Sequence, residues 1–186
     1  MASIEDNAFN YCENIKKMTF TGSIAKIGTG AYTVNSDRYT EMALDELHIN
    51  NIKEWCNNSF SLGANPIGYS KKTFINGKES CSIDIPNDVK RINNFVFSGC
   101  KVLTEVNILG ENIEIGSSAF SGCSNLRAIN IPDGTTSIGS SAFSGCSSLN
   151  SITLPSSLEA LSQYLFYGCS SLEAINIPND IINIPS

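Results

Sequence analysis

The chain has 186 residues, of which 41% are apolar and 16% are charged, and its formal net charge is −6. Nucleic acid is an unsuitable partner, because backbone binding needs a basic footprint and no lysine or arginine follows Arg127. No apolar run approaches the roughly 18 residues of a membrane span, so we expect no membrane insertion, and no signal peptide is visible. The 14 glycines favour a turn-rich array over a helical bundle.

The opening residues already belong to a coil of this array. Ile4 stands five residues before Phe9, and Ala31-Tyr32 follows Ala8-Phe9 after 23 residues, so the sequence begins inside a repeat. We therefore expect a fragment of a longer protein, whose upstream part would carry any export signal. The first coil should leave apolar surface uncovered, since repeat arrays normally carry a cap at that end.

The middle of the chain departs from the repeat near residues 33–43 and 61–80. The second departure is the longer, and its Asn76-Gly77 dipeptide predicts a tight hairpin turn. Three lysines also make it the most basic part of the chain, and loops that leave a repeat often hold a binding site. One candidate contact surface therefore consists of the aromatic and basic residues of this interrupted unit: Trp55, Tyr69, Lys71, Lys72 and Lys78.

From residue 83 onward the sequence repeats with a period of 23 residues. The period is carried by two residue types, namely the phenylalanines Phe97, Phe120, Phe143 and Phe166 and the cysteines Cys100, Cys123, Cys146 and Cys169. A strict period of this kind predicts a solenoid, in which equal positions of successive coils lie over one another at about 4.8 Å. Phenylalanines and cysteines should therefore form two internal columns. A single coil is too small to form a core, so it must stack on its neighbours.

Each regular unit combines a short strand with a proline. Residues 126–131 end in the alternation expected of a strand with one face inward, and Pro132 cannot continue a ladder because it has no amide hydrogen. After a turn, Ile138 and Phe143 lead the chain back across the far side of the coil. The pattern predicts about seven coils in a single domain, residues 1–186.

The unit from Ala119 to Pro132, Ala-Phe-Ser-Gly-Cys-Ser-Asn-Leu-Arg-Ala-Ile-Asn-Ile-Pro, resembles the repeat of the BspA-type leucine-rich-repeat family. The resemblance covers nearly the whole chain, and residues 52–77 resemble an interrupted unit seen between regular repeats of such proteins. It implies a leucine-rich-repeat solenoid: a right-handed curved superhelix with a parallel β-sheet on its concave face and short strands, helical turns and loops on its convex side. It also implies a surface or secreted protein of a host-associated microbe, often an adhesin that binds extracellular-matrix proteins or other cells.

Patterns that indicate catalysis are few. His48 is the only histidine, and its place between Leu47 and Ile49 on an expected strand turns its side chain outward to solvent. A catalytic base there would also need an orienting partner and a nucleophile within reach. Ser23 and Lys26 match a short acylating-serine pattern, but its companion motifs are missing. We therefore expect no enzyme and no cofactor.

The seven cysteines raise the alternatives of a metal site, disulfides or free thiols. Zinc sites use cysteine pairs about two to four residues apart, and the sequence has no such pair. Bridges between stacked coils are possible by Cα separation, but a column of in-phase cysteines behaves more simply as small buried hydrophobic residues. We expect reduced, structural thiols and no metal. Cys81 stands apart, on a strand where the repeat places no cysteine.

The outward strand residues form a second candidate surface on the concave sheet. Its polar members are Thr104, Glu105, Asn107, Arg127, Asn130, Asn150, Thr153, Glu173 and Asn176. A rigid parallel sheet would hold them side by side for a protein or a glycan to dock on. The alternative is that they only keep the sheet soluble, because aromatic anchors, which usually carry binding energy, are absent from the regular columns.

Together with the resemblance, these patterns favour a non-catalytic module for adhesion and protein recognition. The resemblance implies that it is located at the cell surface or secreted and that its partners are host matrix proteins or other cells, while the polar strand face would also suit a glycan. The alternative is a structural spacer that holds another domain away from a cell surface. No particular oligomeric state follows from the pattern.

Overall fold

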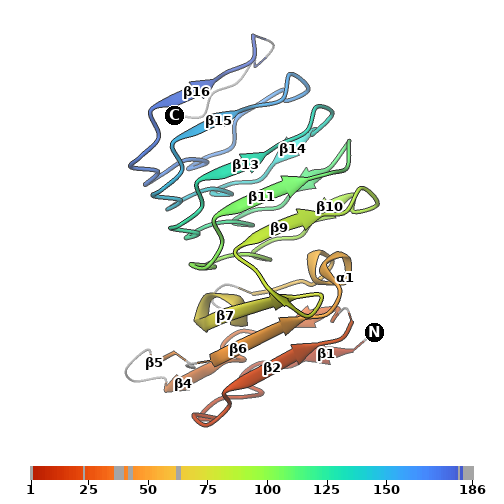
Figure 1. Ribbon diagram of the computed structural model, residues 1–186, viewed down its shortest axis with the longest axis vertical. Helices are drawn as coiled ribbons and strands as arrows, with labels where there is room; N and C mark the ends of the chain where they lie inside the picture. Colours follow the sequence, from red (N-terminus) through yellow and green to blue (C-terminus); the bar gives the residue numbers. More distant parts are fainter. Residues whose placement is uncertain are drawn as a thin grey trace.

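The computed structural model describes residues 2–22, 24–35, 40–41, 44–61, 64–179 and 181. The chain winds into a parallel β-solenoid of about seven turns, whose coils stack along one axis from the N-terminal to the C-terminal end (Figure 1). This confirms the predicted fold. The described part of residues 33–43 includes the antiparallel pair β4 (Thr33–Asn35) and β5 (Thr40–Glu41), and Ser23 lies outside the described residues.

Most coils contribute one strand to a main row. These strands are β2 (Lys17–Phe20), β6 (Leu44–Ile49), β7 (Ser70–Ile75), β9 (Ser82–Ile85), β11 (Glu105–Ile108), β13 (Ala128–Asn130), β15 (Ser151–Thr153) and β16 (Ala174–Asn176). We call the outward side of this row the strand face. Shorter strands form a second row: β1 (Ser3–Ile4), β3 (Lys26–Ile27), β10 (Arg91–Ile92), β12 (Glu114–Ile115) and β14 (Ser137–Ile138).

The main row is interrupted after β7. A hairpin joins β7 to the antiparallel strand β8 (Lys78–Glu79), and its turn residues Asn76 and Gly77 both have positive φ, 50° and 80°, as the predicted tight turn requires. One sheet therefore ends in the order β2-β6-β7-β8, and another begins with β9. We call residues 2–79 the N-terminal block and residues 82–179 the regular array.

Side chains join the two parts across this interruption. The short helix α1 (Ile52–Cys56) is capped by the Asn51 side chain, and Trp55 Nε1 donates to the carbonyl oxygen of Val96 at 3.1 Å. Asn65, at the start of the 3-10 helix η1 (Pro66–Tyr69), donates from Nδ2 to the carbonyl oxygens of Phe95 and Val96 at 2.7 and 2.6 Å. We call these contacts the seam.

The predicted columns fill the core of the regular array. The rings of Phe97, Phe120, Phe143 and Phe166 stack nearly parallel, with successive centroids 5.2, 5.7 and 5.9 Å apart. The thiols of Cys123, Cys146 and Cys169 each donate to a carbonyl oxygen of the preceding coil, at 3.1 to 3.2 Å. Close stacking also explains one glycine, because a Cβ on Gly139 would lie 2.4 Å from the Ser117 nitrogen.

Cys81 requires a correction to the sequence-based expectation. It lies one residue before β9 rather than on the strand, and its side chain is exposed. Its carbonyl oxygen accepts from the backbone amide of Thr104 at 2.7 Å. All seven cysteines are free thiols, which agrees with the expectation of reduced cysteines.

Candidate functional site

The predicted polar columns lie on the strand face of the regular array. Parallel register places Asn107 of β11 beside Asn130 of β13 and Asp84 of β9. Asn107 is half-buried and donates to an Asp84 carboxylate oxygen at 3.1 Å, and the half-buried Thr104 hydroxyl donates to the Cys81 carbonyl at 3.0 Å. These bonds hold two side chains in place. The other predicted members are exposed: Glu105, Arg127, Asn130, Asn150, Thr153, Glu173 and Asn176.

A hollow of about 300 Å³ lies on this face, over β11, β13 and β15. It coincides with a change in strand pairing, because β13 belongs to the sheet of β9 and β11, whereas β15 pairs with β16. The hollow brings together four of the predicted residues: Glu105, Asn107, Asn130 and Thr153. The other five predicted residues on this face are not among its lining residues: Thr104, Arg127, Asn150, Glu173 and Asn176.

The alternative surface at the interrupted unit is not a single patch. Trp55 is a correction: its side chain is 1% exposed, because it fills the interior of its coil and bonds to the next one, so it is not available to a ligand. Tyr69 is half-buried and lines a small cavity of about 190 Å³. The lysines lie on the two strands of the hairpin, β7 and β8, and none of them lines this cavity.

Carboxylates partly neutralise these lysines. Lys71 Nζ lies 2.7 Å from Asp45 Oδ1, and Lys72 Nζ lies 3.3 Å from Glu79 Oε2. The hydrogen bond from Lys71, followed by its charge, lowers the pKa of the Asp45 carboxyl. Lys78 is exposed on β8. The patch that the sequence suggested was basic therefore contains both positive and negative side chains, which pair with one another.

The strand face of the N-terminal block carries a polar and aromatic cluster that the sequence-based prediction missed. The rings of His48 and Phe74 stack at 4.3 Å with an interplanar angle of 2°. Glu46 lies 2.9 Å from His48 Nε2 and 3.1 Å from Lys17 Nζ, and these hydrogen bonds lower the pKa of its carboxyl. His48 faces outward as expected, but its side chain is only 17% exposed. The sequence could have predicted this cluster from strand alternation. Neighbouring residues of a strand point to opposite faces, so an inward Thr73 implies an outward Phe74.

Two exposed tyrosines in the last coil were also missed. Tyr164 and Tyr167 are 67% and 71% exposed, and their rings meet edge to face at 6.3 Å. They occupy the phase at which the preceding coil has Ser141 and Ser144. Comparison of successive repeats position by position would have found them, since exposed aromatic residues often anchor protein contacts.

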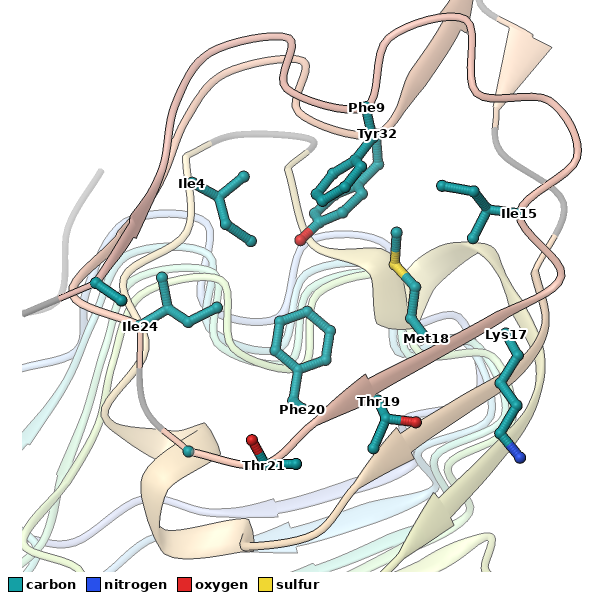
Figure 2. Close-up of a pocket in the computed structure, with 12 residues that line it drawn as sticks. Ile4, Phe9, Ile15, Lys17, Met18, Thr19, Phe20, Thr21, Ile24 and Tyr32 are labelled. Atoms are coloured by element: carbon teal, nitrogen blue, oxygen red, sulfur yellow. The ribbon is translucent and has the colours of Figure 1, made fainter.

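The first coil ends in an open apolar hollow of about 620 Å³. Figure 2 shows Ile4, Phe9, Met18, Phe20 and Ile24 around it. The Tyr32 ring stacks on Phe9 at 5.4 Å, and its hydroxyl points into the hollow (Figure 2), buried and without a hydrogen-bond partner. Apolar surface is therefore uncovered at this end, as expected from the sequence.

The thiols of the regular array are poor nucleophiles. Burial raises the pKa of Cys100 and Cys146 to about 12, so both remain protonated at neutral pH. Among the described residues, no three His, Cys, Asp or Glu side chains gather closely enough to hold a metal ion. The described helices are also too short to span a membrane.

Comparisons with known proteins agree with this architecture. A leucine-rich cell-surface protein of Faecalibacterium prausnitzii superposes with a TM-score of 0.61 at 21% identity, over 98% of this chain and 59% of that protein. A leucine-rich-repeat protein of Bacteroides ovatus gives 0.54 at 22% identity, over 99% of this chain and 48% of that one. The leucine-rich-repeat protein of T. pallidum gives 0.52 at 19% identity, over 99% and 66%. These likenesses establish the fold.

The sequence itself identifies the family. No curated protein matches it. The family described as "BspA type Leucine rich repeat region" matches with six copies, over residues 1–65 and 68–186. The chain therefore belongs to the BspA-type leucine-rich-repeat family.

Proposed function

We propose that this chain is a non-catalytic module for adhesion and protein recognition that binds its partner through the strand face of the regular array. Leucine-rich-repeat surface proteins are generally protein-interaction modules and are typically non-catalytic. The F. prausnitzii protein of the same fold is described as a cell-surface protein. A surface or secreted location for this chain is part of the proposal.

One observation carries the proposal: a hollow on the strand face is lined by outward polar side chains. Asn107 is held by its bond to Asp84, so it loses little side-chain entropy when a partner binds. Asn130 and Thr153 are exposed beside it on the following strands. Such a row of amide, hydroxyl and carboxylate groups matches the hydrogen-bonding groups of a protein surface or a glycan.

Arg127 provides the charged contact of the proposed site. It is exposed directly before β13, and no carboxylate pairs with it among the described residues. Its guanidinium can bind a partner carboxylate in bidentate fashion. It is also the last cation of the chain. No lysine or arginine further along the array can therefore compete with it for a partner carboxylate. We infer that Arg127 orients the partner.

The test is binding to immobilised extracellular-matrix proteins and to cell-surface glycans, measured by surface plasmon resonance. The combined change of Thr104→Ala, Arg127→Ala and Asn130→Ala should weaken binding by at least about tenfold, with an unchanged melting temperature. The matched control combines Lys71→Ala, Lys72→Ala and Lys78→Ala in the N-terminal block, and it should bind as the unmodified chain does.

If the triple lysine variant loses binding while the Thr104, Arg127 and Asn130 variant keeps it, the site lies on the hairpin of the N-terminal block instead. A chain that shows no saturable binding at roughly tens of micromolar, corresponding to less than about 7 kcal/mol of binding free energy, would instead support the structural spacer. If the chain binds and both combined variants keep that binding, a combined Tyr164→Ser and Tyr167→Ser variant shows whether the exposed tyrosines are the contact.

A further inference from the structure

We propose that the hollow on the strand face of the regular array receives a lysine side chain of a partner protein, with Glu105 as its counter-ion. The inference rests on the proposed function and names the chemical group that its site binds. It depends on the charge of the hollow, on its hydrogen-bond acceptors and on its shape.

Glu105 supplies the charge. It lines the hollow from β11 and is exposed, and no lysine or arginine pairs with it among the described residues. Among the described residues that line the hollow, no other is charged. The hollow therefore carries an unbalanced negative charge, and the net charge of −6 on the chain attracts cationic partners over a longer range. A neutral sugar would meet the same polar groups but would leave this charge unbalanced.

Amide oxygens add acceptors beside this carboxylate. Asn107 donates from Nδ2 to Asp84 Oδ1 at 3.1 Å, so its own Oδ1 remains available as an acceptor. The exposed Asn130 lies next to it on β13 in parallel register. A lysine ammonium carries three donors and no acceptor. One carboxylate and the amide oxygens of two neighbouring strands therefore match it.

The separation of β13 from β15 adds a backbone acceptor at the edge of the hollow. Just before their strands, other successive coils are joined by a bond from the Arg127 amide to the Thr104 carbonyl oxygen, and by one from Glu173 to Asn150, both at 2.9 Å. The equivalent bond from the Asn150 amide to the Arg127 carbonyl oxygen is not formed between these two described residues. This carbonyl oxygen therefore adds to the acceptors that surround the hollow.

Ala128 gives the hollow its shape. It is exposed and lies in register with Glu105 on one side, and Ser151 holds the same phase in the next coil. Short side chains at both positions leave an open floor, on which the four-carbon stem of a lysine can lie while its ammonium reaches the carboxylate. Arg127, which also has no ion pair among the described residues, would bind a carboxylate of the same partner.

NMR titration of the full, isotopically labelled chain with hexalysine tests the proposal, and hexalysine with acetylated side chains serves as the uncharged probe. Hexalysine should shift the signals of residues 128–130 and 151–153 in a saturable way, and the acetylated peptide should not. Glu105→Gln keeps the side-chain size but removes the charge, and it should weaken binding about tenfold. Ala128→Leu fills the hollow and should weaken binding to a similar extent.

Matched controls on β16 separate the hollow from a general attraction to an acidic chain. Glu173→Gln removes an exposed charge outside the hollow, and Ala174→Leu enlarges the residue that holds the phase of Ala128 two coils later. Both variants should bind hexalysine within about twofold of the original chain, because an isolated surface charge contributes little. Equal losses from Glu105→Gln and Glu173→Gln would overturn the proposal. So would equal shifts from the acetylated peptide or from maltoheptaose, a neutral sugar.

Failure of this inference can be told apart from failure of the proposed function. A matrix protein that binds through the strand face with equal affinity to the original chain and to Glu105→Gln would overturn the lysine assignment alone. Absence of saturable binding to matrix proteins and glycans, with hexalysine still shifting the signals of the hollow, would overturn the proposed function alone.

Discussion

The N-terminal block and the regular array fill the same solenoid interior in different ways. In the array one ring type recurs, and Phe120 stacks on Phe97 at 5.2 Å and on Phe143 at 5.7 Å. In the N-terminal block Trp55 meets Phe20 edge-on at 5.0 Å and Phe60 at a tilt at 5.1 Å. The identical rings of the array thus all stack in parallel, whereas the N-terminal block mixes the angled contacts around Trp55 with one parallel stack, Phe9 on Tyr32, at an interplanar angle of 7°.

The seam shows how side chains of the irregular coils replace the strand pairing that is missing between the two sheets. Where the main row is interrupted between β7 and β9, strand pairing between the two sheets is replaced by bonds from Trp55 and Asn65 to the Phe95 and Val96 carbonyls. Each of these donors is 4% exposed or less, so the bonds form away from water. A solenoid can therefore accept a non-repeating unit when side chains satisfy the backbone of the next coil.

The largest effect is expected in the middle of the phenylalanine column. Phe120 is 0% exposed, and Phe120→Ala should lower the free energy of unfolding by about 3–5 kcal/mol, from lost burial and the cavity left behind. Urea unfolding followed by circular dichroism measures this. Phe9→Ala, at the open end where the ring is half-buried, serves as the comparison and should cost less. An unchanged midpoint for Phe120→Ala would contradict the stacked column.

The next largest effect tests the seam. Asn65→Ala removes two hydrogen bonds to the Phe95 and Val96 carbonyls and leaves the buried Ile67 amide without its acceptor. The loss should be about 2–4 kcal/mol, because a buried donor without a partner is costly. Asn107→Ala removes an exposed amide-carboxylate bond and should change stability by only about 0.5 kcal/mol. Equal effects of the two substitutions would show that the seam does not hold the N-terminal block to the array.

The same contrast explains how far the sequence predicts the molecule. A strict period specifies both the strand positions and the columns, so the core of the array and the exposed polar row follow from spacing alone. Trp55 has the phase of Ile138 relative to its phenylalanine, which already indicated burial, but its place in an irregular unit suggested a surface role. No sequence pattern predicts the hollow near β13 and β15. The residues on those strands keep the repeat, although the strand pairing changes there.

A smaller effect concerns the buried thiols of the array. Burial raises the pKa of Cys100 and Cys146 to about 12 and that of Cys123 well above its usual range. Above about pH 8.5 the unfolded chain loses thiol protons that the folded chain keeps, so stability should fall as pH rises. Urea midpoints between pH 7 and pH 10 should decline more steeply for the original chain than for Cys123→Ala. The exposed Cys81 is the control, because Cys81→Ala should leave the slope unchanged.

The smallest effect belongs to the strand face of the N-terminal block, where Glu46 meets both His48 and Lys17. Hydrogen bonds from His48 and then Lys17 hold the pKa of Glu46 below its ordinary value. A lowered carboxyl pKa stabilises the folded chain at neutral pH, and this contribution disappears as pH falls through the folded-state value. NMR titration should find the Glu46 pKa depressed, and His48→Ala should raise it toward normal while Lys17 keeps part of the shift. Because the carboxyl is exposed, the melting temperature of His48→Ala at neutral pH should change little; a large drop would mean that stacking on Phe74, rather than the charge, stabilises this face.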